Sequence, residues 1–322
     1  MAIPQVSAII CTYNRAHDLD GALRSLLDQQ FSGRYEIIVV DNASNDRTAA
    51  VVQAWQVQAG NRVPIRYLYE ATLGLSVARN TGAAAARAEI LAYLDDDAIA
   101  HPTWLVSLWQ VFQAHSAVAI AGGKVQLQWP DSMSPPPWLS AGLRSSLGAY
   151  DLGDRLQLID CPGQTPRGVN YAIRRSFWQS VGGFDVQLGR VGGNLLSNEE
   201  LYMTQLAIHA GQQVAYVPQA LVLHKVSPNR LRIAWFFRRS WWQGISEYHR
   251  ERQIGSRFRV QLQQGTDRLL RGLYHALRPH QDLAQRLDHV VYAYGQLGYL
   301  AIVLKEGLTQ KVGHRLVRSV VS

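Results

Sequence analysis

Short apolar runs alternate with segments of helical periodicity through roughly the first two hundred residues of this 322-residue chain. This alternation restricts the fold to an α/β architecture, in which helices flank a sheet of largely buried strands. The apolar runs predict strands over residues 6–11, 36–40, 65–69, 90–94, 117–127 and 214–223. The segments between them predict helices around residues 19–27 and over residues 48–55, 74–88, 104–112 and 197–210.

The pattern changes near residue 230, after which three arginine-flanked helices are expected over residues 233–250, 257–277 and 283–305. We therefore predict an α/β domain of residues 1–229 and a basic, mainly helical region of residues 230–322. The charge divides in the same way, since the first part holds 16 Lys and Arg against 18 Asp and Glu and the second holds 16 against 6. Such a local excess of arginine is typical of a segment that meets an acidic surface, either membrane lipid or nucleic acid.

The two cysteines, Cys11 and Cys161, form no CxxC pair and no Cys/His cluster. Their number and placement argue against a structural zinc site or a disulfide framework and favour a reducing cytosol. The N-terminus lacks the basic segment and the long apolar stretch of a secretory signal. The best candidate for a membrane span, residues 290–304, is short and is interrupted by Gln296 and glycines, so we expect none.

Three consecutive carboxylates, Asp95, Asp96 and Asp97, follow directly on the predicted strand over residues 90–94. Like charges this close repel one another and resist desolvation, so the cluster needs a cation or exposure to water. In an extended segment Asp95 and Asp97 point to the same side, where both can bind one divalent ion such as Mg²⁺ or Mn²⁺. Taken alone, the triplet is equally compatible with a solvated acidic turn before the next helix.

Other polar residues stand at the ends of predicted strands, where open α/β sheets bind their ligands. Thr12 and Asn14 follow the first strand, and Asp41 follows the second. Asp41 is a candidate acceptor for a base N–H or a ribose hydroxyl, or else it begins a turn and caps a helix. His224 follows the last strand and either completes a metal shell or has an ordinary structural role.

Two further candidates lie on predicted helices. Arg79, on an alanine-rich helix, suits contact with a diphosphate or a sugar, or else is a surface arginine. Glu199 and Glu200 stand at a helix start, where a carboxylate can act as general base toward a hydroxyl. Ser197 and Glu200 also have the spacing of a capping box, which would give them a structural role instead.

The order of these motifs is more specific than any one of them. They read VSAIICTYNR at residues 6–15, DNASND at 41–46, GLSVARNTG at 74–82, LDDD at 94–97, GGFD at 182–185 and NEE at 198–200. In this order, over residues 4–226, the chain resembles the family 2 glycosyltransferases of GT-A fold. The resemblance implies a Rossmann-like, nucleotide-binding mixed sheet flanked by helices, with a helical C-terminal extension, and it makes residues 1–229 the catalytic domain.

The activity that the resemblance implies is that of an inverting, hexosyltransferase-type enzyme. The donor would be a nucleotide sugar, usually a UDP-sugar, and the cofactor a divalent metal, Mn²⁺ or Mg²⁺. The acceptor would be a hydroxyl of a saccharide or of a lipid-linked molecule, as in the synthesis of surface or extracellular polysaccharide.

The resemblance also implies roles for single positions. Residues that would bind the donor nucleotide are Thr12, Tyr13, Asn14, Arg15, Asp41, Arg79, Asp95 and Asp96. Residues that would bind the metal are Asp95, Asp97 and His224, and those that would border the donor sugar and the acceptor are Gly168 and Asn170. The catalytic base falls at Glu199–Glu200, where the family usually has Glu-Asp. Because the second acid is a glutamate here, its carboxylate reaches one methylene further, and either glutamate can be the base.

The first C-terminal helix, residues 233–250, combines large aromatic residues with flanking arginines. This composition is typical of a helix that lies in a membrane interface, although the same stripe could pack on the catalytic domain. Because lipid-linked acceptors are common among relatives, we predict a cytoplasmic enzyme held peripherally on the inner face of the plasma membrane. The anionic membrane surface would meet residues 230–322, and no nucleic acid is expected as a partner.

Two other classes of function compete with glycosyl transfer. A sugar nucleotidyltransferase also uses an α/β sheet with acidic metal ligands, but it predicts a Gly-rich basic loop directly after the first strand. This chain has Thr12-Tyr13-Asn14 there. A non-catalytic protein that binds membranes or nucleic acid would use the basic region, and it would not need acids ordered along strand ends.

Overall fold

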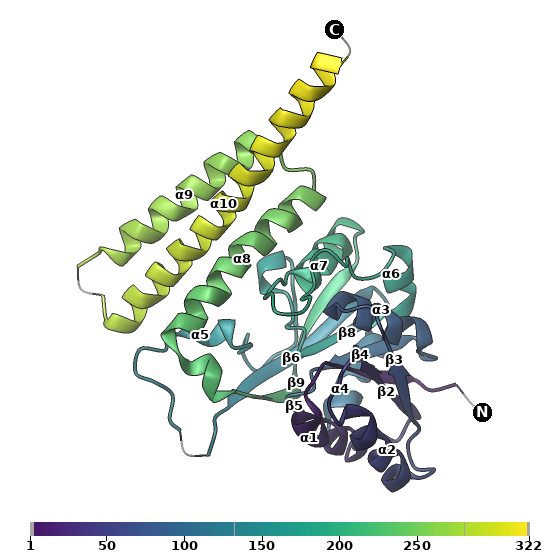
Figure 1. Ribbon diagram of the computed structural model, residues 1–322. Coiled ribbons are helices and arrows are strands. Elements are labelled where there is room, and N and C mark those ends of the chain that lie inside the picture. Colours follow the sequence, from purple (N-terminus) through teal and green to yellow (C-terminus); the bar gives the residue numbers. More distant parts are fainter. Residues whose placement is uncertain (1–2, 132, 280, 321–322) are drawn as a thin grey trace. The chain divides into compact units, whose positions relative to one another are not determined.

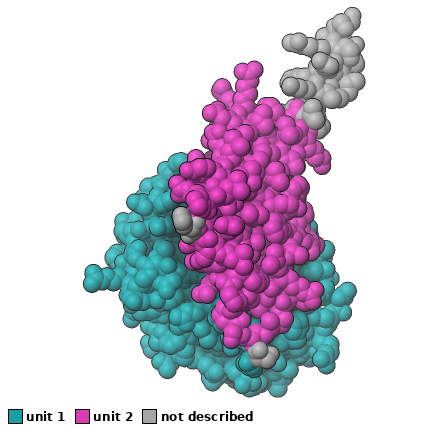
Figure 2. Space-filling view, turned by 90° about the vertical axis from the view of Figure 1, so that its left-hand side faces the viewer, with its two compact units in different colours: residues 1–132, 147–192, 199–226 teal, residues 133–146, 193–198, 227–322 magenta. Residues whose placement is uncertain are grey.

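The computed structural model describes residues 3–131, 133–279 and 281–320, with the backbone alone for residues 308–320. The chain forms two compact units, which are coloured separately in Figure 2. Unit 1 comprises residues 1–132, 147–192 and 199–226, and unit 2 comprises residues 133–146, 193–198 and 227–322. The strands belong to unit 1 and the long C-terminal helices to unit 2.

A single mixed sheet organises unit 1, with the strand order β3-β2-β1-β4-β8-β6-β9-β5 and the short β7 beside β9. The strands are β1 (Val6–Thr12), β2 (Tyr35–Asp41), β3 (Ile65–Tyr69), β4 (Ile90–Leu94), β5 (Ala98–Ala100), β6 (Val118–Gln128), β7 (Gln157–Leu158), β8 (Asn170–Arg174) and β9 (Gln213–Lys225). β1 to β4 run parallel, β8 is antiparallel to its neighbours β4 and β6, and β9 is parallel to β6. The predicted mixed α/β sheet is therefore confirmed.

Helices cover both sides of this sheet (Figure 1). On one side lie α1 (Ala16–Leu27), α2 (Thr48–Ala59) and α4 (Trp104–Ala114), and on the other lie α3 (Leu75–Ala85), α6 (Arg175–Ser180) and α7 (Glu199–His209). A strand that is covered on both sides consists of a continuous apolar run, and every residue of β2 is buried. The 3₁₀ turn η1 (Pro162–Gln164) lies beside α7.

Unit 2 is built on three helices, α8 (Ile233–Gln253), α9 (Phe258–Ala276) and α10 (Leu283–Val320), with the short α5 (Ala141–Ser146) and the turn η2 (Pro228–Leu231). α10 packs against both α8 and α9 and is the central helix of the three. Glycines allow the close approach: Gly244 of α8 lies against Gly295 of α10, and Gly265 of α9 lies against Tyr299. In the part of the chain that the structure describes, every helix is too short or too polar to cross a bilayer.

The contact between α8 and α10 predicts an unusual effect of alanine at Gly244. A Cβ there would overlap the Gly295 carbonyl oxygen and lie 2.8 Å from the Tyr299 nitrogen. In an open helix, replacing glycine by alanine stabilises by about 1 kcal/mol. Here we expect Gly244→Ala to lower the free energy of unfolding by about 1–3 kcal/mol, because the two helices must move apart. Urea denaturation followed by circular dichroism measures the change.

A matched control is Gly193→Ala in the same unit. No atom lies within 4 Å of a Cβ added at Gly193, so its free energy of unfolding should change by less than about 0.5 kcal/mol. Equal stability of the two variants would contradict the close packing of α8 on α10.

Candidate active site

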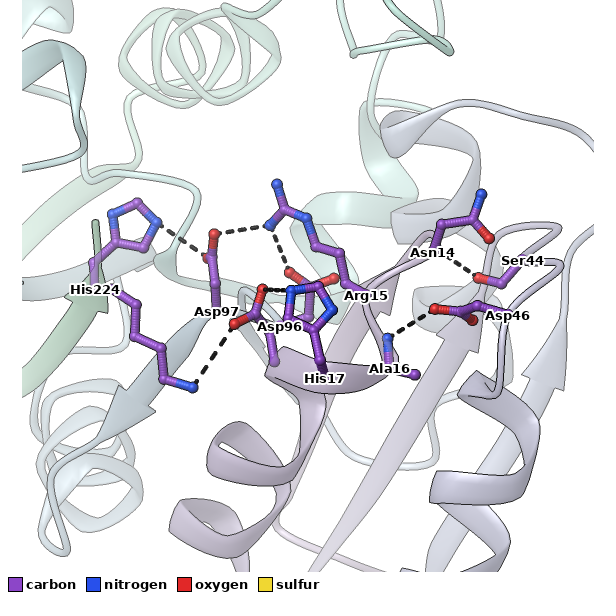
Figure 3. A network of polar contacts seen from close by, with 11 residues as sticks. Asn14, Arg15, Ala16, His17, Ser44, Asp46, Asp96, Asp97 and His224 are labelled. Atoms are coloured by element: carbon purple, nitrogen blue, oxygen red, sulfur yellow. Dashed lines mark hydrogen bonds and ion pairs between the residues drawn. The ribbon is translucent and has the colours of Figure 1, made fainter. Parts of the chain in front are cut away.

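The loops that follow β1 and β2 are tied together at the carboxyl end of the sheet. The register places Thr12 opposite Asp41. Asn14 has a left-handed backbone with φ of 53°, a conformation that asparagine tolerates better than most residues. Its N–H donates to Ser44 Oγ at 2.9 Å (Figure 3). Its Oδ1 accepts from the N–H of Asn45 at 2.8 Å. The loops are thereby held in one conformation.

Asp41 lies buried at the end of β2 and holds its own loop. Its Oδ1 accepts from the N–H of Ser44 at 2.9 Å, so part of the turn interpretation is correct. Its Oδ2 accepts from the Tyr67 hydroxyl at 2.8 Å. Burial, together with this carboxylate, raises the pKa of Tyr67 to about 12, so the hydroxyl keeps its proton. An ionised carboxylate has about four acceptor sites, which leaves room for a further N–H or O–H donor.

The acidic triplet and His224 come together through a short strand pair. β5 begins directly after Asp97 and pairs antiparallel with β9, with Ala98 opposite His224. This pairing brings His224 Nε2 to 3.1 Å from Asp97 Oδ1 (Figure 3). One ligand atom from each of Asp95, Asp97 and His224 lies within 4.8 Å of the others. The three residues expected at a metal site therefore form one cluster.

The hydrogen bonding of His224 suits a cation. Its Nδ1 lies 2.8 Å from the carbonyl oxygen of Leu147, and because a carbonyl can only accept, this nitrogen carries the proton. A neutral imidazole then turns the lone pair of Nε2 toward the Asp97 carboxylate. Two acceptors that face each other need a cation or a second proton between them. Two carboxylates and an imidazole are ligands that Mn²⁺ accepts, so the cluster can hold a divalent ion.

Asp96 turns to a different partner from its two neighbours. Arg15 Nη1 lies 2.9 Å from Asp96 Oδ1 and 2.8 Å from Asp97 Oδ2. Burial raises the pKa of Asp96 to about 7 against the opposing charge of Arg15. The Arg15 side chain is one-third exposed, so it borders the metal cluster and also meets solvent. Tyr13, two residues before it in the chain, is exposed, and Thr12 is buried.

Arg79 is buried, which rules out the interpretation as a surface arginine. Its Nη1 donates to Glu199 Oε1 at 2.9 Å and to Glu200 Oε1 at 2.8 Å. Its guanidinium lies over the ring of Phe184, 5.5 Å from the centroid, and 6.0 Å from that of Tyr93. Arg79 thus links α3 to the first turn of α7, with two aromatic rings beside it.

The two glutamates differ in their surroundings. The Glu199 side chain is 3% exposed and that of Glu200 15%. Burial, with the nearby charge of Glu200, raises the pKa of Glu199 to about 8 although Arg79 opposes the shift. Oε2 of Glu199 is buried and has no hydrogen-bond partner among the described residues. Burial therefore favours the protonated form of Glu199, whereas Glu200 retains access to solvent.

The alternative role of Ser197 and Glu200 as a capping box is not observed. The N–H of Ser197 donates to Ser246 Oγ at 3.0 Å, and Glu200 Oε1 accepts from Arg79. The Glu200 carboxylate is thus held by an arginine, not by the backbone at the helix start.

Gly168 and Asn170 occupy different environments. A Cβ on Gly168 would overlap Glu200 Oε1, so only glycine allows the carboxylate to lie this close to the backbone. Asn170 is fully buried: its Oδ1 accepts from Trp104 Nε1 at 2.8 Å, and its Nδ2 donates to the Ala220 carbonyl at 2.7 Å. The structure brings Gly168 to the glutamates, and it uses Asn170 inside the sheet.

Three contributing residues have no clear signal in the sequence. Tyr67 and Tyr93 lie within apolar strands, where a tyrosine is an ordinary core residue. Phe184 is part of the GGFD motif, and its segment is held by Asn80, whose Nδ2 donates to the Phe184 carbonyl at 2.8 Å. The GGFD motif could have drawn attention to Phe184, but it does not indicate that the ring lies beside Arg79.

Comparisons with known proteins agree with this geometry. Residues 7–169, about half of the chain, match the family described as Glycosyl transferase family 2. The Glucosyl-dolichyl phosphate glucuronosyltransferase of Haloferax volcanii is 25% identical over 248 residues, which are 76% of either chain. The Succinoglycan biosynthesis protein ExoM of Rhizobium meliloti is 27% identical over 239 residues, which are 73% of this chain and 71% of that protein.

The fold also has a counterpart among solved structures. The mannosyltransferase PcManGT from Pyrobaculum calidifontis, in complex with GDP-Man and Mn²⁺, aligns with a TM-score of 0.56 at 16% identity. The alignment covers 100% of this chain and 81% of that one. The chain therefore belongs to glycosyl transferase family 2 and is a nucleotide-sugar-dependent glycosyltransferase of GT-A fold.

Proposed function

We propose that this enzyme transfers a sugar from a UDP-sugar to a hydroxyl of a saccharide or lipid-linked acceptor, with inversion at the anomeric carbon. The observation that carries the proposal is the position of Arg79. Its guanidinium binds Glu199 and Glu200, and the charge of Asp95 also acts on it. A candidate base is therefore bound to the same buried cation on which the charge of the metal cluster acts, as expected for transfer from a metal-bound diphosphate.

The donor nucleotide is assigned to the loops after β1 and β2. Thr12, Tyr13 and Asn14 would line the nucleoside, and Asp41 would accept the uracil N–H with the acceptor capacity that Ser44 and Tyr67 leave. The buried position of Asp41 favours a single, directional contact, because water competes poorly there.

The metal is assigned to Asp95, Asp97 and His224, whose ligand atoms lie within 4.8 Å of one another. A Mn²⁺ or Mg²⁺ held by these residues would supply positive charge that stabilises the departing nucleoside diphosphate. Arg15, which touches Asp97 and Asp96, would add a second positive charge beside the diphosphate. Asp96 would hold Arg15 in place.

Glu200 is assigned as the general base. Its carboxylate accepts the proton of the acceptor hydroxyl while that oxygen bonds to the anomeric carbon. The bond from this carbon to the diphosphate oxygen breaks, and the nucleoside diphosphate leaves with the electron pair on the opposite side, which inverts the centre. Arg79 positions the carboxylate, and Gly168 lets it lie close to the backbone beside the sugar. Asn170 supports this segment from inside the sheet.

The setting follows from the two parts of the chain. We assign catalysis to residues 1–229 and attachment to an anionic membrane surface, on the cytoplasmic side, to the basic residues 230–322. Similarity to proteins named for succinoglycan biosynthesis and for a dolichyl phosphate substrate supports a role in surface or extracellular polysaccharide synthesis. No nucleic-acid partner is assigned.

The donor assignment predicts that UDP together with Mn²⁺ stabilises the protein. At a ligand concentration of about 100 times Kd the gain is about 2.7 kcal/mol, which a thermal-shift assay detects. Asp97→Ala should lose this stabilisation, and Asp28→Asn, an exposed carboxylate outside the cluster, should keep it. Absence of stabilisation by UDP and Mn²⁺ would contradict the assignment. Stabilisation by GDP in place of UDP would mean that the donor carries guanine and not uracil.

The metal assignment predicts that the ion binds even without nucleotide. Mn²⁺ titrated under electron paramagnetic resonance should bind the unchanged protein. His224→Gln should weaken binding at least about tenfold, since even the loss of an outer partner of a metal ligand commonly has that effect. Asp28→Asn serves again as the control. Unchanged Mn²⁺ affinity in His224→Gln would remove the histidine from the site.

The assignment of the base predicts opposite results at two adjacent residues. Glu200→Gln keeps an oxygen that can accept from Arg79 but removes the base, so kcat should fall about 10²- to 10⁴-fold while UDP affinity stays. Glu199→Gln should retain most of kcat, because an amide resembles the protonated acid that burial favours there. Steady-state kinetics with a competent donor and acceptor measure both. If Glu199→Gln is inactive and Glu200→Gln active, Glu199 is the base.

A further inference from the structure

Unit 2 leaves large apolar side chains in solvent along two of its helices. Six of them are between 38% and 83% exposed: Leu270, Leu273 and Leu277 of α9, and Val290, Leu297 and Leu304 of α10. We call these six residues the open face. Scattered exposed leucines are ordinary, whereas a contiguous set usually marks a surface with a partner.

Helical spacing places the open-face residues of each helix opposite the side on which that helix meets Glu251 of α8. In α9, Arg268 turns inward and donates to Glu251 of α8 at 2.8 Å, and the three leucines follow it by two, five and nine residues. At about 100° per residue, each of these steps leads to the opposite side of the helix. In α10, Tyr299 donates to the same Glu251, and the open-face residues recur every seven residues opposite that tyrosine.

The open face continues toward α8 through aromatic rings. Tyr294, four residues after Val290, has its ring centroid 5.2 Å from that of Phe237 and 5.6 Å from that of Trp241. α10 lies between α9 and α8, so the three helices present one broad apolar surface.

The other side of the same helices is covered by the unit's own segments. Phe236 packs edge-on against Trp138, with centroids 5.6 Å apart. Ser140 Oγ donates to Asp288 of α10 at 2.8 Å, and Gln243 of α8 donates to Asn198 at 2.9 Å. The chain thus supplies a cover for one side of the helices, whereas the open face is exposed.

Half of the acidic residues of this region lie on the covered side. Residues 230–322 hold 16 Lys and Arg against 6 Asp and Glu. Three of these acids lie on the covered side, where Glu247 and Glu251 bind Arg268 and Asp288 binds Ser140. Exposed arginines continue the rows of the open face: Arg259 lies eleven residues before Leu270, and Arg286 lies eleven before Leu297, which is close to three full turns.

We propose that the open face is the surface by which this protein lies on an anionic phospholipid bilayer. Aliphatic side chains enter the interface while the arginines in the same rows meet the lipid phosphates. A second copy of the chain is disfavoured as the cover, because it would bring two arginine-rich surfaces together. Nucleic acid is disfavoured as the partner, because its phosphate backbone would not bind six aliphatic side chains. The inference rests on the membrane attachment proposed above and names the surface that carries it; flotation of the unchanged protein tests the attachment, and the leucine variants test the surface.

The test uses the full-length protein and vesicles of phosphatidylcholine with or without phosphatidylglycerol, followed by flotation. The unchanged protein should float with the anionic vesicles and much less with the neutral ones. The combined variant Leu273→Gln, Leu277→Gln, Leu297→Gln should float at least about fivefold less. Arg259→Gln with Arg286→Gln should reduce flotation and lessen its dependence on salt, since basic residues near the surface are attracted to the anionic lipid.

A matched control replaces exposed apolar residues of unit 1, Val57→Gln with Val186→Gln, and should float like the unchanged protein. Circular dichroism checks the fold of each variant. If the triple variant is unfolded, Leu277→Gln alone, the most exposed position, should still lower flotation. The proposal is overturned if the leucine variants float like the unchanged protein. It is equally overturned if light scattering shows that they dissociate a dimer, because a second copy would then cover the face.

Discussion

The candidate active site depends on one buried ion-pair group, Arg79 with Glu199 and Glu200. A buried charge that loses its partner costs about 3–5 kcal/mol, so Arg79 requires a carboxylate beside it. The arginine comes from α3 and the glutamates from α7, and the distance between them is therefore set by electrostatics as well as by packing. The rings of Tyr93 and Phe184 restrict the guanidinium further. These contacts leave Glu200, the proposed base, one position.

Much of the sheet was predictable because most of its strands are short apolar runs. The run at residues 65–69 coincides with β3 (Ile65–Tyr69), and the run at 90–94 coincides with β4. β5 has three residues directly after the acidic triplet, too few to show a period, and β8 begins with the buried polar residue Asn170. Neither has a local signal, yet β5 is the strand that brings His224 to Asp97.

The residues of the site were easier to predict than their contacts. Strand ends and the order of motifs pointed to Asp41, the triplet, Arg79 and the two glutamates. The pairing of Arg79 with residues 120 positions away, and the unequal burial of the two glutamates, are properties of the folded chain. The aromatic stripe of α8 is a similar case. From the sequence, either a membrane or the catalytic domain was predicted as its partner. In the structure, Phe237 and Trp241 contact Tyr294 of α10 in their own unit.

The pairing of β5 with β9 has a consequence for folding. Asp97 and His224 are 127 residues apart in the chain, so their cluster exists only after most of unit 1 has assembled around it. Contacts between residues so far apart in the chain form late, because closing the loop costs conformational entropy before the contact contributes any stabilising free energy. An unfolded chain therefore cannot offer this ligand set, and any ion that binds there acts on the native state alone. The cation would then serve two purposes. It would take part in the reaction, and it would stabilise the folded state by holding the segments of Asp97 and His224 together.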